Sequence, residues 1–78
     1  MVELFCVLYR KSLSSDYYVH KCFPSYEKHK AVSLARLSTK KLGGISHVYK
    51  CIGIEKYGTF YKLNEFELAT YVNGQHIY

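Results

Sequence analysis

The chain has 78 residues, of which 49% are hydrophobic, and it carries a formal net charge of +5 at pH 7. This length allows one small domain with a single core, which we place over residues 1–78. The apolar fraction excludes a disordered chain. The apolar stretches are far shorter than the roughly 20 residues that a membrane helix needs, so we expect no membrane partner.

The basic residues are concentrated in the first two thirds of the chain. From Arg10 to Lys50 there are nine basic residues and only two acidic ones, whereas Glu65 and Glu67 follow the last lysine, Lys62. This asymmetry favours an anionic partner, either nucleic acid or an acidic protein surface. A charge that serves solubility alone also fits the composition.

The three cysteines, Cys6, Cys22 and Cys51, are odd in number and widely separated. This pattern predicts reduced thiols rather than a disulfide framework. The first ten residues lack the basic and then apolar pattern of a secretory signal. We therefore expect a cytoplasmic protein.

The N-terminal third contains two predicted strands. Residues 2–10 (VELFCVLYR) are rich in strand formers and precede a Ser/Asp cluster, and residues 17–23 (YYVHKCF) end at the only proline, Pro24. We expect these strands to form a hairpin.

Residues 25–42 change to a helical period. Ser25 is a suitable N-cap, and Gly43 and Gly44 end the pattern. The predicted buried stripe follows three-and-four spacing and consists of Ala31, Leu34, Ala35, Ser38 and Leu42. The opposite side of this amphipathic helix is cationic.

The C-terminal part indicates strands over residues 45–56 and 59–63, joined by a turn at Tyr57 and Gly58. In residues 64–74, Asn64 and Glu67 match a capping box, which favours a short helix. The alternation in this segment, followed by Asn73 and Gly74, also fits a strand and a hairpin. The predicted fold is therefore α+β: a small antiparallel sheet in ββαββ order, one amphipathic helix across one face, and a short C-terminal helix or hairpin.

The two similar stretches YVHKC (18–22) and HVYKC (47–51) place side chains alternately on the two faces of the sheet. Because unpaired cysteines behave as small buried hydrophobes, we assign Leu4, Cys6, Leu8, Cys22 and Cys51 to the face under the helix. The other face, left open for binding, would carry Phe5, Val7, Tyr9, Val19, Lys21, Phe23, Lys50 and Ile52. The reverse assignment, with Val19, Phe23, Val48, Ile52 and Ile54 buried, fits the alternation as well.

The sequence lacks the motifs of the common catalytic and metal sites. No C-x-x-C or H-x-x-x-H pair is present, so we predict neither a metal nor another cofactor. No nucleophile elbow or phosphate-binding glycine loop occurs, and we predict no catalytic residues and no enzyme activity. The alternative is a small metal-independent ribonuclease of toxin type, which needs only a base, a cation and an acid; His20, His29 and His47 are its candidate groups.

Nucleic-acid binding is the better-supported function. The predicted helix carries five of the candidate contacts: Lys28, Lys30, Arg36, Lys40 and Lys41. A second set on the open sheet face consists of Lys21, Lys50 and Tyr9. Because the motifs of RNA-recognition, KH and helix-turn-helix domains are missing, we expect recognition of backbone and shape rather than base sequence.

The predicted strand order, the tyrosine-rich strands and the basic helix "EKHKAVSLARLSTKKLGG" resemble small phage-encoded counter-defence proteins, such as anti-CRISPR proteins and toxin-inhibitory factors. The resemblance implies a non-enzymatic inhibitor in the host cell cytoplasm. Its partners would be RNA, a host nuclease or a toxin protein of a toxin-antitoxin system. A homodimer or other homo-oligomeric module, with the open sheet face buried between copies, is a further hypothesis.

Overall fold

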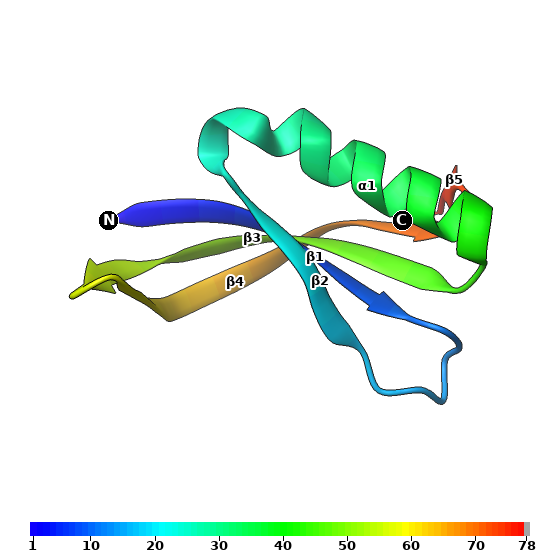
Figure 1. The fold of residues 1–78 in the computed structure, drawn as a ribbon, viewed down its shortest axis with the longest axis horizontal. Coiled ribbons are helices and arrows are strands. Elements are labelled where there is room, and N and C mark those ends of the chain that lie inside the picture. Colours follow the sequence, from blue (N-terminus) through cyan, green and yellow to red (C-terminus); the bar gives the residue numbers. More distant parts are fainter. Residues whose placement is uncertain (78) are drawn as a thin grey trace.

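The structure, a computed structural model, describes residues 1–77. The elements follow one another as β1 (Val2–Arg10), β2 (Tyr18–Pro24), a 3-10 helix η1 (Ser25–Glu27), α1 (Lys28–Leu42), β3 (Ile45–Lys56), β4 (Thr59–Val72) and β5 (Gln75–His76). The five strands form one antiparallel sheet in the order β2-β1-β3-β4-β5. Helix α1 lies across one face of this sheet (Figure 1).

The predicted ββαββ order with a C-terminal helix is wrong, because the observed order is ββαβββ. Residues 64–72 continue β4, which pairs with β3 from Lys56 opposite Thr59 to Ile45 opposite Val72. A strand here forms hydrogen bonds with the backbone groups on the side of β3 that faces away from β1. A helix in this segment would leave those groups unpaired. Asn73 and Gly74, with φ angles of 51° and 79°, then turn the chain into β5.

The core is formed by small residues of α1 and large residues of the sheet. Ala31 and Ala35 are completely buried, so the helix axis can approach the strands closely. The buried cluster consists of Phe5, Val7, Phe23, Ala31, Ala35, Val48, Ala69 and Tyr71. Leu42, which we expected in the buried stripe, is 68% exposed at the end of the helix.

The assignment of the sheet faces is also wrong. Phe5, Val7 and Val48 lie under α1, whereas Leu4, Leu8 and the cysteines belong to the open face, defined here as the face that α1 does not cover. The helix stripe is too small to fill the core by itself, so the large side chains of the sheet must face it. The reverse assignment is correct for Phe23 and Val48. It is wrong for Ile54, which is 39% exposed, and for Val19, because a bulge between Val7 and Leu8 in the β1–β2 pairing places Val19 opposite Leu8.

Long-range hydrogen bonds attach the C-terminal part of α1 to the segments around it. The Tyr9 hydroxyl donates to the Gly43 carbonyl oxygen at 2.8 Å, and the Gly74 amide donates to Thr39 Oγ1 at 3.0 Å. Both bonds join segments that are more than 30 residues apart in the sequence. They fix the helix end relative to β1 and to the β4–β5 turn.

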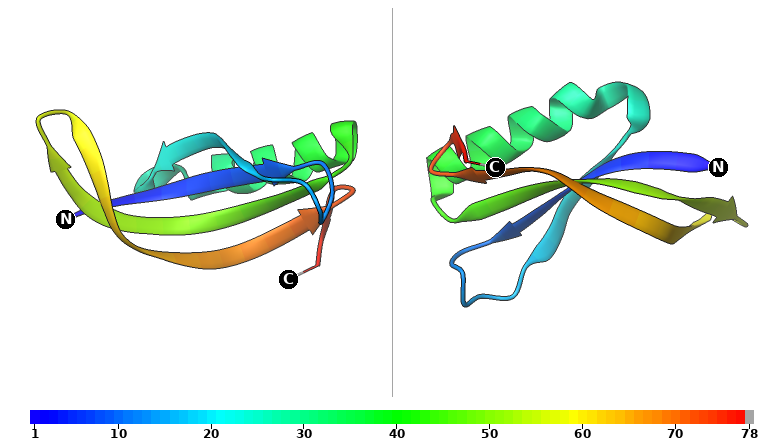
Figure 2. Two further views of the ribbon diagram at one scale, coloured as in Figure 1. Left: turned by 90° about the horizontal axis from the view of Figure 1, so that it is seen from below. Right: turned by 180° about the vertical axis from the view of Figure 1, so that it is seen from behind.

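The β3–β4 hairpin extends past the end of the helix and curves, as Figure 2 shows in its left view with the open face toward the reader. Two irregularities in the pairing, at Val48/Tyr49 and at Ile52/Gly53, contribute to this curvature. Gly53 permits a close approach: a Cβ atom there would overlap the Tyr61 backbone oxygen and lie 2.7 Å from Phe60 Cζ. The ring of Phe60 can therefore lie against β3 and reach the open face.

We expect Gly53→Ala to lower the free energy of unfolding by about 1 to 3 kcal/mol, because the added methyl group must push the backbone of β4 away. Gly58→Asn in the hairpin turn is the control: its φ is 78°, nothing lies within 4 Å of its Cβ position, and asparagine tolerates this conformation. Urea unfolding of both variants provides the comparison. An unchanged stability of Gly53→Ala would contradict the close packing of the hairpin.

Candidate functional site

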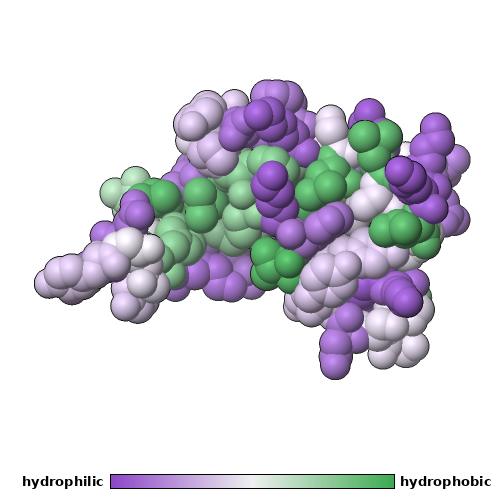
Figure 3. Space-filling model, viewed as in Figure 1, coloured by the Kyte–Doolittle hydropathy of each residue, from purple (hydrophilic) through white to green (hydrophobic). Residues whose placement is uncertain are grey.

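The solvent-exposed surface of α1 is cationic, and its cations are distributed around the helix, two of them beside rings of the sheet. We call Lys28, Lys30, Arg36, Lys40 and Lys41 together the basic helix side; all five are exposed. Figure 3 shows hydrophilic residues along this side of the helix at the top of the view. Lys40 and Lys41 in the last turn also complement the negative end of the helix dipole.

Most of these cations do not pair with carboxylates of the chain. Lys30 forms an ion pair with Glu27, but in residues 1–77 the other four have no carboxylate partner. Lys28 Nζ lies 5.9 Å from the ring centroid of Phe5, and the guanidinium carbon of Arg36 lies 5.8 Å from that of Tyr71. Such ring contacts orient a cation and leave its N–H groups available to an anion.

The second set of predicted contacts is not brought together on the open face. Lys50 lies 3.4 Å from Glu3, and Lys21 Nζ lies 5.1 Å from the Phe23 ring centroid on edge strand β2. Tyr9 is only 4% exposed and uses its hydroxyl to hold the helix end. Tyr9 is therefore a structural residue and is not part of an accessible binding surface.

The open face contains a pocket of about 340 Å³ that no local pattern in the sequence indicates. We call it the open-face pocket; it is lined by Leu4, Cys6, Leu8, Tyr17, Val19, Cys22, Tyr49, Cys51, Phe60, Lys62 and Glu65. Strand pairing assembles it, since Leu4 lies opposite Cys51, Cys6 opposite Tyr49, and Leu8 opposite Val19. The curved β4 adds Phe60 and Lys62 at the end near the hairpin tip.

Cys6 and Cys22 form a disulfide between β1 and β2, so the prediction of three reduced thiols is wrong. The two cysteines are direct partners in the strand pairing, a relation that sequence separation alone does not reveal. Cys51 is a free, buried cysteine of the same pocket. Burial raises the pKa of its thiol, which therefore stays protonated near neutral pH.

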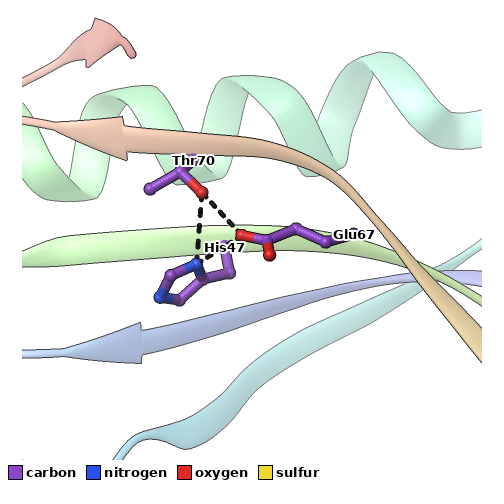
Figure 4. A network of polar contacts seen from close by, with 3 residues as sticks. All are labelled: His47, Glu67 and Thr70. Atoms are coloured by element: carbon purple, nitrogen blue, oxygen red, sulfur yellow. Dashed lines mark hydrogen bonds and ion pairs between the residues drawn. The ribbon is translucent and has the colours of Figure 1, made fainter. Parts of the chain in front are cut away.

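His47 of β3 and Glu67 and Thr70 of β4 form a polar network (Figure 4). The network lies next to the pocket, because the His47 ring contacts two tyrosines of the pocket lining. His47 Nδ1 lies 2.7 Å from Glu67 Oε1 and 3.3 Å from Thr70 Oγ1, and the Thr70 hydroxyl donates to Glu67 Oε1 at 2.6 Å. An ionised carboxylate only accepts, so the His47 ring nitrogen donates in this pair. The Thr70 bond, followed by His47 and the charge of Arg10, lowers the pKa of Glu67.

Further ionisable groups of this face have displaced pKa values. Burial, together with the charge of Glu67, raises the pKa of the Tyr49 hydroxyl, and the hydrogen bond from Lys62 to Glu65 raises that of the Lys62 ammonium. The His47 ring lies between two tyrosines, with centroid distances of 6.1 Å to Tyr17 and 6.3 Å to Tyr49. Displaced pKa values that cluster around a pocket are typical of binding and catalytic sites.

Among residues 1–77, no group of three or more His, Cys, Asp or Glu side chains is arranged to hold a metal ion. Within the same residues, no helix is long and apolar enough to cross a membrane. Comparison of the chain with protein families, with curated proteins and with solved structures found no significant match.

We expect Glu67→Gln to destabilise the protein at neutral pH and to have little effect in acid. A lowered pKa in the folded state means that ionised Glu67 contributes stability above the ordinary glutamate pKa of about 4.3, and that this contribution is lost as the pH falls through the lowered value. Urea unfolding at a series of pH values should show the stabilities of the two proteins converging as the pH falls. Glu55→Gln at the exposed hairpin end is the control. If the stability difference between Glu67→Gln and the unmodified protein does not change with pH, the network is contradicted.

We expect a reductant to lower the free energy of unfolding by about 3 kcal/mol, because the disulfide joins residues 16 positions apart. Thiol titration of the denatured protein should detect one thiol before reduction and three afterwards. Cys51→Ala should keep the sensitivity to reductant, whereas Cys22→Ala should lose it. Three reactive thiols without reduction would disprove the Cys6–Cys22 bond.

Proposed function

We propose that the protein is a non-enzymatic RNA-binding protein that contacts the phosphate backbone through the basic helix side. The observation that carries this proposal is that four of its five cations, all except Lys30, have no carboxylate partner among the described residues. Cations that are already compensated within the protein add little to binding. Uncompensated ones release condensed counterions from a nucleic acid when they meet its phosphates.

The arrangement of the cations supports contact with a chain of phosphates. Arg36 and Lys40 are one helical turn apart, about 6 Å along the axis, so that both can contact one strand. Leu37, 60% exposed, lies with Lys40 and Lys41 around a shallow hollow. An apolar side chain between two ammonium groups suits the sugar of a nucleotide rather than the edge of a particular base.

An inhibitory role in counter-defence, acting on a host nuclease or toxin in the cytoplasm, remains a prediction from the resemblance described above. An acidic surface of such a protein would use the same cations as RNA does. The disulfide removes the cysteine-based argument for a cytoplasmic location. The RNA proposal does not depend on that location.

The three histidines considered for a ribonuclease lie in separate places. His20 is exposed on edge strand β2, His29 is exposed on α1, and His47 is 9% exposed on the open face. A general acid and a general base must reach the same phosphodiester. This dispersal favours binding over cleavage, and incubation of the purified protein with RNA tests it directly.

We expect Arg36→Glu/Lys40→Glu to weaken binding to short single-stranded RNA about 10-fold or more, because two phosphate contacts become repulsive. For the unmodified protein, the logarithm of the binding constant should fall with the logarithm of salt concentration with a slope of about −3, as for four neutralised phosphates. Fluorescence anisotropy at several salt concentrations measures both quantities.

Lys11→Glu/Lys56→Glu is the matched control. It changes the net charge by the same amount at exposed positions outside α1. Its binding should fall much less than that of the helix variant. Equal losses in the two variants would show that net charge alone, and not the basic helix side, drives the interaction.

A further inference from the structure

Several strands contribute apolar side chains to the open-face pocket. Leu4 and Leu8 of β1 line it beside the disulfide, Val19 of β2 lines one side, and Phe60 of β4 lies at the end near the hairpin tip. Its volume of about 340 Å³ is at the lower end of the range for small-molecule sites, about 300 to 1,000 Å³. The volume suits a ligand of one or two fused rings.

Several polar groups of the lining can donate a hydrogen bond to a ligand. Because its pKa is raised, the Tyr49 hydroxyl keeps its proton near neutral pH, and so does the Cys51 thiol. Tyr17 adds a second hydroxyl. The carboxylate in the lining, Glu65, already accepts a hydrogen bond from the Lys62 ammonium at 2.8 Å.

The charges of the lining compensate each other. Lys62 and Glu65 form an ion pair, and the other lining groups are apolar or neutral hydroxyl and sulfur groups. A charged ligand finds no uncompensated counter-charge in this lining, because the two charged groups already neutralise each other. A neutral ligand needs no counter-charge. Phe60, Tyr17 and Tyr49 supply ring surfaces against which a planar aromatic group packs well.

We propose that the open-face pocket is a binding site for a neutral, planar aromatic ligand that carries a hydrogen-bond acceptor. The Tyr49 hydroxyl donates to that acceptor, and the leucines, Val19 and Phe60 enclose the ring. The site lies on the opposite side of the sheet from α1. It is therefore independent of RNA binding by the basic helix side.

The test uses two probes of nearly the same shape, quinoline and naphthalene, which differ by one ring nitrogen. At slightly alkaline pH both are neutral, and only quinoline offers an acceptor. We expect NMR titration to show saturable binding of both probes. The dissociation constant of quinoline should be lower than that of naphthalene by between about 2-fold and 10-fold, the range that one hydrogen bond supplies. Tyr49→Phe should remove this preference while naphthalene still binds.

Two further variants test whether the probes bind in the open-face pocket. Val19→Trp should fill the pocket and abolish binding of both probes, whereas Leu42→Trp, at the far end of α1, should leave binding unchanged. Val19 and Leu42 are 59% and 68% exposed, so both variants should fold, and thermal unfolding verifies this. The protein contains no tryptophan, so each variant also gains a unique fluorophore at the site of change.

Three results would overturn the proposal. Absence of saturable quinoline binding would rule out the site, and binding that persists in folded Val19→Trp would place it elsewhere. Equal affinity for the two probes would refute the ligand class. Light scattering on the same samples adds a fourth: a dimer that Val19→Trp dissociates would show that a second copy of the chain covers the pocket.

Discussion

The packing of small helical residues against large sheet residues determines the rest of this structure. Ala31 and Ala35 lie against the sheet with no exposed surface, and the volume between helix and strands is filled from the sheet by Phe5, Val7 and Val48. A helix with so little side-chain volume leaves voids unless large side chains lie opposite it, and the thiols of the other face do not supply that volume. Which face is buried follows from this constraint, and so does which face remains for a ligand.

The strand irregularities extend this constraint to the open face. Because the side chains of a strand alternate, a bulge exchanges the faces on one side of it. The bulge in β2 brings Val19 to the same face as Leu8, and the irregularity at Gly53 accompanies the curvature that brings Phe60 toward β1. The pocket is thus a consequence of departures from regular pairing. It is placed away from the helix, so the protein has two chemically different surfaces.

The sequence predicted those features that depend on local pattern. The helical period and the glycine stop located the helix near its observed bounds, 28–42, and with it the exposed cations. Features that depend on the partner strand were not predictable. The capping pattern at Asn64 and the alternation that follows it are both valid local signals, and only pairing with β3 decides between them. The Cys6–Cys22 bond can be predicted only when the register of β1 and β2 is known. The structural role of Tyr9 depends in the same way on the position of the helix end that its hydroxyl contacts.

The covalent link between β1 and β2 has a consequence for assembly. Strand β2 is at the edge of the sheet, and an edge strand is the part of a fold that most readily detaches and exchanges with the same strand of a neighbouring molecule. With Cys22 bonded to Cys6, β2 cannot leave its own β1, so domain swapping through this hairpin is blocked in the oxidised chain. Breaking the bond restores that freedom. The Cys6–Cys22 bond thus restrains one route by which two copies of the chain could intertwine, the exchange of β2.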